Sequence, residues 1–256
     1  MSALKIDKIF ACPNCKNPVH SPKGREKCKF CGFKFKYKDG IWYFLKNGKS
    51  KTNKSLKKYD LLHKENSGDP NDGSYEVLAS FASGNKTLDI ACGQGQIEKL
   101  ARETVGLDFS ISALKKAKEK GAKYLVQADA HCLPFKNDSF DIAICAGSLE
   151  HFENPLLAAE EMARVSKIQI LTVHKKYPLP AANLLRSLIL SLKSIPDQPI
   201  DRPFSTVALE KLLQKDKMKP IFKGVWTYPY DFENLGFKVP NFLKLPSCHF
   251  VITTSK

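Results

Sequence analysis

Apolar runs and helical periodicities alternate through the middle of the chain, from residue 87 to residue 173. Short apolar runs are typical of buried strands, whereas segments whose apolar residues recur every three or four positions are typical of amphipathic helices. Strands that alternate with helices indicate βαβ units, so the sequence predicts an α/β fold with a doubly wound, mostly parallel sheet. The expected strands cover residues 87–92, 105–109, 124–129, 140–147 and 168–173, and the expected helices cover residues 97–103, 111–121 and 155–167.

The chain continues beyond these units with less regular patterns. Residues 206–217 have helical spacing, and residues 220–226 and 249–255 are expected to add two closing strands. Residues 176–200 are expected to form an insertion that packs on the core or covers a pocket; the alternative is contact with a membrane surface. Its apolar residues Leu184, Leu185, Leu188, Ile189 and Leu192 fall on one helical face.

The pattern changes near residue 50. Residues 47–58 (NGKSKTNKSLKK) are polar, basic and without apolar periodicity, which is typical of a linker. Before them lie short strand-like stretches with closely spaced cysteines. The expected organisation is a small module over residues 1–48, a linker with a leading helix over residues 49–74, and a larger domain over residues 75–256.

Composition narrows the class of protein. The chain has 256 residues, of which 43% are hydrophobic, and this is enough to build a buried core. The first residues lack the apolar run of a signal peptide, and no stretch approaches the roughly 20 apolar residues that a spanning helix needs. A soluble, cytoplasmic protein without a transmembrane segment is expected. Four of the eight cysteines lie in apolar, strand-like segments, as buried thiols do: Cys92, Cys132, Cys145 and Cys248.

The charge is unevenly placed. The formal net charge is +15, and residues 1–60 hold 16 Lys or Arg against 4 Asp or Glu. Such asymmetry suggests that the N-terminal module faces an anionic partner, with RNA as the first candidate. The alternative is an ordinary solvated basic surface.

The remaining four cysteines form two Cys-x-x-Cys pairs, Cys12-Pro-Asn-Cys15 and Cys28-Lys-Phe-Cys31. Each pair can offer two sulfurs from one tight turn, so the four thiolates can surround one Zn²⁺ tetrahedrally. A module of this size rarely folds on its core alone, and a metal would stabilise it. The sequence therefore predicts a zinc site.

Residues 6–45 resemble the zinc-binding ribbon of the Trm112-like family. In that family two Cys-x-x-Cys knuckles are followed by a Tyr, then Asp-Gly-Ile and a short apolar strand. Tyr37, Asp39, Gly40, Ile41 and Phe44 fill these places here. The resemblance implies a module that activates or accompanies a methyltransferase.

A glycine-rich turn follows the first predicted strand of the larger domain. In Asp89-Ile-Ala-Cys-Gly93-Gln-Gly95, the two glycines let the backbone approach a ligand, and the helix N-terminus beyond offers free N–H groups. The next strand ends at Asp108, where dinucleotide-binding folds hold ribose hydroxyls. These residues alone leave NAD and another adenosyl cofactor as alternatives.

Residues 75–175 resemble the class I S-adenosylmethionine-dependent methyltransferases of the type 11, or quinone-biosynthesis, group, which have a Rossmann-like fold. Four motifs occur in the family's order: residues 88–95, 106–110, 127–135 and 137–152. Two departures are visible. Ala91 replaces the first glycine of the turn, and Ser166-Lys167-Ile168 stands where the family has Lys-Pro-Gly-Gly.

The resemblance implies S-adenosylmethionine as cofactor and assigns roles to residues. The turn would pack against the methionyl part, Asp89 would support the turn, and Asp108 would hold the ribose. Asp129 would accept from the adenine amino group. The implied cofactor-binding residues are Asp89, Ala91, Cys92, Gly93, Gln94, Gly95, Asp108, Phe109, Ser110, Asp129, Ala130 and Ala146.

His151 follows the fourth strand of the domain, at the edge where ligands bind in open α/β sheets, and a histidine can act as general base there. A packed or helix-capping histidine is the alternative. The Asn-Pro-Pro-Tyr motif and the Pro-Cys pair are absent, which argues against methylation of adenine N6 and of pyrimidine C5.

Three functions follow from these patterns. The first is an RNA methyltransferase whose basic zinc module binds phosphates. The second keeps the enzyme but takes a small-molecule or lipid acceptor, as the quinone-type motifs permit. The third is a non-catalytic protein whose ribbon recruits a partner, although the intact cofactor motifs argue against it.

Overall fold

The computed structural model describes residues 4–19, 27–45, 59–61, 73–176, 200–215, 217–227, 231–232, 237–238 and 246–255. Of the predicted linker with its leading helix (49–74), the structure describes residues 59–61, 73 and 74. Of the predicted insertion (176–200) it describes residues 176 and 200, so the insertion's five apolar residues lie outside these ranges. Among the described residues, no helix has the length and apolar character needed to cross a membrane.

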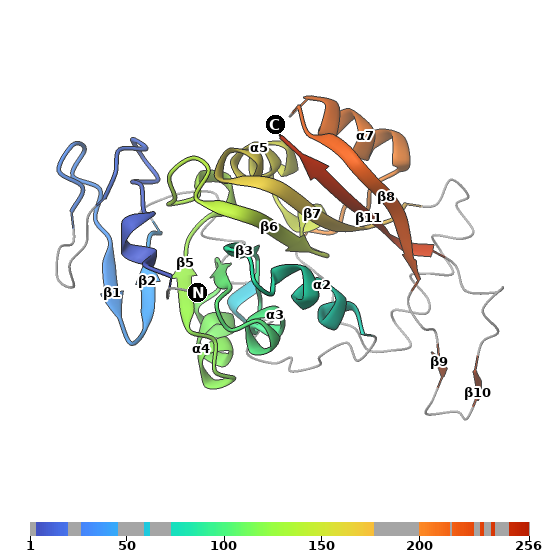
Figure 1. Cartoon of the computed structure of the whole chain (residues 1–256), viewed down its shortest axis with the longest axis horizontal. Coiled ribbons are helices and arrows are strands. Elements are labelled where there is room, and N and C mark those ends of the chain that lie inside the picture. The colour runs from blue at the N-terminus through green and yellow to red at the C-terminus, as the bar shows by residue number, and fades with distance from the viewer. Residues whose placement is uncertain are drawn as a thin grey trace.

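A nine-stranded sheet runs through the whole molecule (Figure 1), in the order β1-β2-β5-β4-β3-β6-β7-β11-β8. The six strands from β2 to β7 are parallel, and antiparallel pairs close both ends. The predicted mostly parallel α/β sheet is therefore confirmed. The strands are β1 Lys36–Lys38, β2 Ile41–Tyr43, β3 Thr87–Ile90, β4 Val105–Asp108, β5 Tyr124–Gln127, β6 Phe140–Ala146, β7 Ser166–His174, β8 Lys219–Thr227 and β11 Pro246–Thr254; β9 (Asp231–Phe232) and β10 (Phe237–Lys238) form a separate antiparallel pair.

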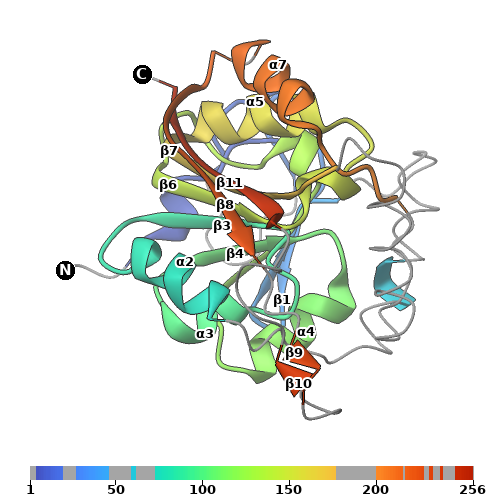
Figure 2. The ribbon, with the colours of Figure 1, turned by 90° about the vertical axis from the view of Figure 1, so that its right-hand side faces the viewer.

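Helices cover both faces of the sheet, as Figure 2 shows with the sheet between them. On one face, α2, α3 and α4 bury apolar side chains against β2, β5 and β6. On the other face, α5 and α7 pack on the strands. The helices are α2 Ser74–Ala82, α3 Gln96–Leu100, α4 Ile111–Glu119, α5 Pro155–Val165 and α7 Thr206–Lys215, with single 3₁₀ turns η1 Ile6–Lys8, η2 Ala130–Cys132 and η3 Leu149–His151.

The N-terminal module is built into this sheet. Strand β2 pairs in parallel with β5, so that Ile41 lies opposite Leu125. Phe10 forms an isolated antiparallel bridge with Phe135, and both side chains are fully buried. Because one hydrophobic cluster contains residues of the module and of the central strands, the two share a core.

The family's turn before the fifth strand of the domain is absent here without loss of that strand. Helix α5 ends at Val165 and β7 begins at Ser166, whose backbone is already extended. The buried side-chain hydroxyl of Ser166 donates to the Met162 carbonyl and so fixes the junction between α5 and β7. The predicted closing elements are present: the helix is α7, and the two strands are β8 and β11.

Candidate cofactor, catalytic and metal sites

The turn between β3 and α3 requires an unusual backbone. Ala91, Gly93 and Gly95 have φ of 60°, 54° and 76°, all in the left-handed region. A Cβ on Gly95 would lie 2.8 Å from the Cβ of Ala117 on α4, so only glycine fits there. Ala91 adopts the same region with its methyl group, at a cost of roughly 1 kcal/mol. The turn keeps its conformation despite the replaced glycine.

Asp108, at the end of β4, ties this turn to the next strand. Its Oδ2 accepts from the Gly93 N–H at 2.9 Å, and its Oδ1 accepts from the Ser110 N–H at 2.7 Å. Each carboxylate oxygen has a second lone pair, so both can also accept from neighbouring hydroxyls. This arrangement fits a ribose whose two hydroxyls meet one carboxylate.

Residues 59–61 lie beside this strand end. Asp60 Oδ1 accepts from the Ser110 hydroxyl at 2.5 Å and from the Ser112 N–H at 3.0 Å. The Tyr59 hydroxyl donates to the His151 carbonyl at 3.2 Å. Burial raises the pKa of Tyr59 to about 12, so it is a neutral phenol at neutral pH. These two residues therefore bridge the ends of β4 and β6.

Asp129 follows β5 and caps η2. Its Oδ1 accepts from the His131 N–H at 2.9 Å and lies 2.6 Å from His131 Nδ1. His131 Nε2 accepts from the Asn154 N–H at 3.2 Å, so the ring proton lies on Nδ1, toward the carboxylate. Burial alone would raise the pKa of Asp129, but the hydrogen bonds from His131 outweigh it and lower the pKa. Asp129 is thus a carboxylate with a fixed orientation.

Two carboxyl groups are buried beneath the glycine turn. Asp89 on β3 and Glu98 on α3 are almost fully inaccessible. Burial raises the pKa of both, that of Glu98 to about 8. The charge of Glu98 adds to the rise at Asp89, and the charge of Asp108 adds to the rise at Glu98. A Cβ on Gly106 would lie 2.8 Å from Glu98 Oε1, so the glycine makes room for this carboxyl. The pair is not doubly ionised at neutral pH.

A second cluster of polar side chains lies at the carboxyl ends of β6 and β7. Gly147, just after β6, donates its N–H to the Thr172 hydroxyl at 2.9 Å, which holds the two strand ends together. Glu150 and His151 follow on η3, and His174 ends β7. Their carboxylate oxygen and ring nitrogens lie within 4.8 Å of one another.

The four ribbon cysteines form a separate cluster. Cys12 Sγ lies 3.5 Å from Cys31 Sγ, and Cys15 Sγ lies 3.6 Å from Cys28 Sγ. Sulfurs around a tetrahedral zinc with bonds of about 2.3 Å lie roughly 3.8 Å apart, so this geometry suits zinc. Burial raises the pKa of Cys12 to about 12, whereas the Asn17 side-chain amide lowers that of Cys15 to about 6.

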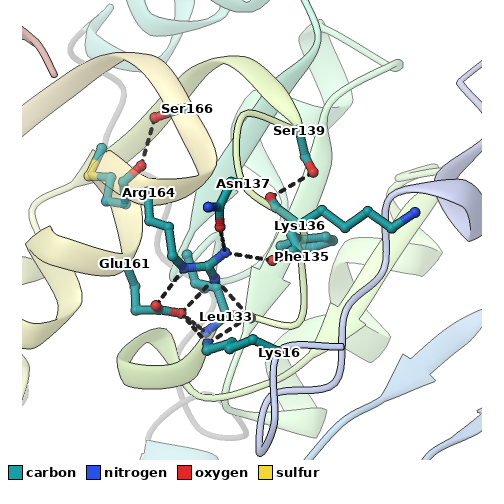
Figure 3. A network of polar contacts seen from close by, with 10 residues as sticks. Lys16, Leu133, Phe135, Lys136, Asn137, Ser139, Glu161, Arg164 and Ser166 are labelled. Carbon is teal, nitrogen blue, oxygen red and sulfur yellow. Dashed lines mark hydrogen bonds and ion pairs between the residues drawn. The ribbon is translucent and has the colours of Figure 1, made fainter. Parts of the chain in front are cut away.

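A polar network joins the first cysteine knuckle to the loop after β5 (Figure 3). Glu161 on α5 accepts at 2.7 Å both from the Lys16 ammonium and from the Leu133 N–H. Arg164 donates to both oxygens of Glu161 and to the Phe135 carbonyl. One carboxylate therefore positions the ribbon and the segment that follows Asp129.

The predicted cofactor residues gather at one edge of the sheet. Asp89 and the turn, Asp108, Asp129 and Ala146 come from four neighbouring parallel strands, and His151 lies beside them. Sequence reasoning missed Tyr59, Asp60, Glu98 and the Lys16–Glu161 pair. Tyr59 and Asp60 follow a basic stretch without periodicity, so nothing in the pattern marks them. His174 directly follows a predicted strand (168–173), and this position was the available signal.

Residues 88–169 match the family described as a methyltransferase domain. An uncharacterised protein of Methanocaldococcus jannaschii is 42% identical over 107 residues, which are 40% of this chain and 42% of that protein. A demethylmenaquinone methyltransferase of Staphylococcus aureus is 38% identical over 95 residues, which are 33% of this chain and 39% of that protein. The chain thus matches about two fifths of the length of these relatives.

Solved structures extend the likeness over most of the chain. A SAM-dependent methyltransferase of Thermotoga maritima has a TM-score of 0.57 at 19% identity, over 80% of this chain and 96% of that one. A chain from the complex between the Haloferax volcanii Trm112 methyltransferase activator and a methyltransferase has a TM-score of 0.56 at 14% identity, over 79% of this chain and 96% of that one. The chain has the class I methyltransferase fold, as predicted.

Proposed function

We propose that this chain, whose residues 88–169 match a methyltransferase domain, transfers the methyl group of S-adenosylmethionine to an acceptor. The observation that carries the proposal is the position of Asp108 at the carboxyl end of β4, where its carboxylate accepts from the Gly93 N–H of the glycine turn. An acidic residue at this place suits the ribose of an adenosyl cofactor.

When bound, S-adenosylmethionine supplies an electrophilic methyl carbon on a sulfonium. The chain's own residues bind and orient. The backbone from Ala91 to Gly95 would hold the methionyl part, Asp108 the ribose, and Asp129 the adenine amino group. Ala146, at the end of β6, would border the sulfonium.

We further propose that Cys12, Cys15, Cys28 and Cys31 bind one Zn²⁺. The two knuckles are built alike, because the Cys12 carbonyl accepts from the Lys16 N–H and the Cys28 carbonyl accepts from the Gly32 N–H. The role of the metal would be structural, since four sulfurs leave no open position. The resemblance of this module to Trm112-like ribbons stays a prediction.

RNA is the first candidate acceptor, because the outer edge of the ribbon is basic and aromatic. Lys36, Tyr37 and Lys38 of β1 are all exposed. Phe30, in the second knuckle, is 68% exposed. Lysines that neutralise phosphates beside exposed rings that stack on bases suit a single-stranded RNA.

A small-molecule acceptor is the second candidate. The observation in its favour is the 38% identity with a demethylmenaquinone methyltransferase over 95 residues. An enzyme of this kind would not need the ribbon's lysines for substrate binding.

The two candidates differ in which cellular fraction takes up label. We would incubate the full chain with methyl-labelled S-adenosylmethionine and with RNA, lipid, small-molecule or protein fractions. Label in RNA that is lost in a Lys36→Glu, Lys38→Glu variant, with unchanged cofactor affinity, supports the first candidate. The matched control reverses two exposed lysines near the opposite edge of the sheet, Lys211→Glu and Lys219→Glu. Label in small molecules alone supports the second candidate, and absence of cofactor binding refutes the methyltransferase.

A further inference from the structure

A buried carboxylate stands at the acceptor end of the site. The Glu150 side chain is 0% exposed, and its Oε1 accepts from the His174 N–H at 2.9 Å. The same oxygen lies 2.7 Å from His174 Nδ1. Oε2 has no hydrogen-bond partner among the described residues. A buried acceptor in this state is costly and calls for a functional explanation.

The two neighbouring histidines differ in what fixes their rings. His151 Nδ1 lies 2.5 Å from the Ile200 carbonyl, which can only accept, so Nδ1 carries the proton. The Glu150 carboxylate lies 2.7 Å from His174 Nδ1 instead, and the two groups form an ion pair when the ring is protonated. A neutral carbonyl orients a ring, whereas a carboxylate also stabilises the imidazolium that forms when the ring takes a proton.

We propose that Glu150 and His174 form a carboxylate–histidine dyad, and that His174 is the general base that accepts the proton of the methyl acceptor. The proposal rests on the proposed methyltransferase function. It replaces the sequence-based choice of His151, which lies beside the dyad with its ring centroid 6.0 Å from that of His174.

The step balances in atoms and charge. The acceptor's lone pair forms the new bond to the methyl carbon, the carbon–sulfur electron pair stays on sulfur, and the acceptor's proton moves to His174 Nε2. The positive charge leaves the sulfonium and appears on the imidazolium beside Glu150. The proton then passes to water, because the His174 side chain is 20% exposed.

The surroundings keep Glu150 ionised. Burial alone would raise its pKa, but the contact with His174 and the charge of His151 lower it. Across β7, Cys248 on β11 lies opposite His174 in the strand register. Burial raises the pKa of Cys145 on β6, so that thiol is neutral.

Two further titratable groups lie near Glu150. Tyr59 is a neutral phenol at neutral pH, because burial raises its pKa to about 12. The charges of Asp201 and Glu150 both act on this phenol, so Asp201 belongs to the same surroundings. Glu150 is therefore the buried carboxylate in direct contact with the base.

The first test needs no acceptor. Nitrogen-15 NMR of the histidine rings in the full chain reports the tautomer of each ring. We expect His174 to carry its neutral-state proton on Nδ1, and to shift toward the Nε2–H tautomer in Glu150→Gln, because the carboxylate that favours a proton on Nδ1 is removed. The control, Glu210→Gln, removes an exposed carboxylate on α7 and should leave the tautomer of His174 unchanged. An Nε2–H tautomer in the wild type, or the same tautomer in the wild type and in Glu150→Gln, overturns the dyad.

The second test measures label transfer against pH, in the fraction that accepts the methyl group. We expect His174→Gln to lower kcat by 100-fold or more, the usual contribution of a general base, and to abolish the acidic limb of the profile. His151→Gln should keep that limb. Normal transfer by His174→Gln refutes the dyad alone. Failure of the wild type to bind the cofactor in calorimetry refutes the methyltransferase instead, and the NMR result stands apart from it.

Discussion

Lys16 and Gly32 occupy equivalent places in the two knuckles, each one residue after the second cysteine. Their φ angles are 58° and 72°. Glycine is at ease there, whereas lysine costs roughly 1 kcal/mol. The Lys16 ammonium lies 2.7 Å from Glu161, and this contact offsets the backbone cost. Strain at a single residue therefore marks the place where the ribbon is joined to α5.

At the same scale, Asp108 is expected to control cofactor affinity. Replacement by Asn removes the charge that accepts from the Gly93 N–H and that is proposed to hold the ribose, so we expect the affinity for S-adenosylmethionine to fall by about 1–3 kcal/mol. Calorimetry on the full chain measures it. Asp141→Asn is the control, because that exposed carboxylate at the start of β6 pairs with Lys167. Equal affinity in wild type and Asp108→Asn would remove Asp108 from the site.

A substitution at Ala91 is expected to stabilise the protein, whereas most substitutions destabilise proteins. Because its φ is 60°, Ala91→Gly relieves a strained backbone and should raise the free energy of unfolding by up to about 1 kcal/mol. Ala163→Gly, inside α5, should lower it by about 1 kcal/mol. Denaturant unfolding compares the two, and a loss of stability in both would show that Ala91 is unstrained.

At the scale of elements, the central strands and helices were predictable because each carries its own pattern. The runs before Ala91 and Asp108 are apolar and short, and parallel strands place their ends at one edge. The pairing of β2 with β5 was not predictable, since Ile41 and Leu125 are far apart in sequence. The Lys16–Glu161 contact was not predictable either, because neither a surface lysine nor a helical glutamate indicates by its type which residue it will pair with.

Glu161 joins three elements, and its loss should be costly. Glu161→Ala removes the charged acceptor of Arg164 and Lys16 and the side-chain acceptor of the Leu133 N–H, so we expect the free energy of unfolding to fall by about 3 kcal/mol. The neighbouring Glu160→Ala removes an exposed carboxylate and should change it by less than about 0.5 kcal/mol. Similar values for the two variants would contradict the role of Glu161.

The stability of the wild type and that of Glu161→Ala should also depend differently on pH. Burial would raise the pKa of Glu161, but Arg164 and Lys16 outweigh it and lower the pKa. A lowered folded pKa contributes stability above the unfolded value of about 4.3, and this stability is lost as the pH falls through the folded value. The gap between wild type and Glu161→Ala should therefore narrow below about pH 4, as acid unfolding curves would show.

At the scale of the whole molecule, the ribbon and the cofactor domain are one packing unit. Phe10 contacts Trp42, Phe44 and Phe135, with ring centroids 4.9 to 5.6 Å apart. The Pro134 carbonyl also accepts from the Ala11 N–H. From the sequence, the polar stretch near residue 50 suggested two separable modules, because a linker's composition says nothing about contacts made on either side of it.

Metal removal should therefore weaken cofactor binding from a distance. We expect a chelator to lower the affinity for S-adenosylmethionine at least 10-fold, because the loop after Asp129 loses the contact of Phe135 with Phe10 and of the Leu133 carbonyl with Lys16. Fluorescence of Trp42, buried in the ribbon, and calorimetry would follow the change. A Cys12→Ser, Cys15→Ser variant should show no further effect of the chelator. Unchanged affinity after complete metal removal would show that the metal site and the cofactor site are not coupled.

The pairing of β2 with β5 also bears on solubility. Without the ribbon, β5 would be the last strand of the sheet, and its run Tyr124-Leu-Val-Gln127 would offer open backbone groups to any other chain. Apolar edges of this kind recruit further strands and lead to aggregation. With the ribbon in place, the outermost strand is β1, which is short and presents Lys36 and Lys38 to water. The lysines of this outermost strand thereby disfavour pairing of the sheet edge with another copy of the chain.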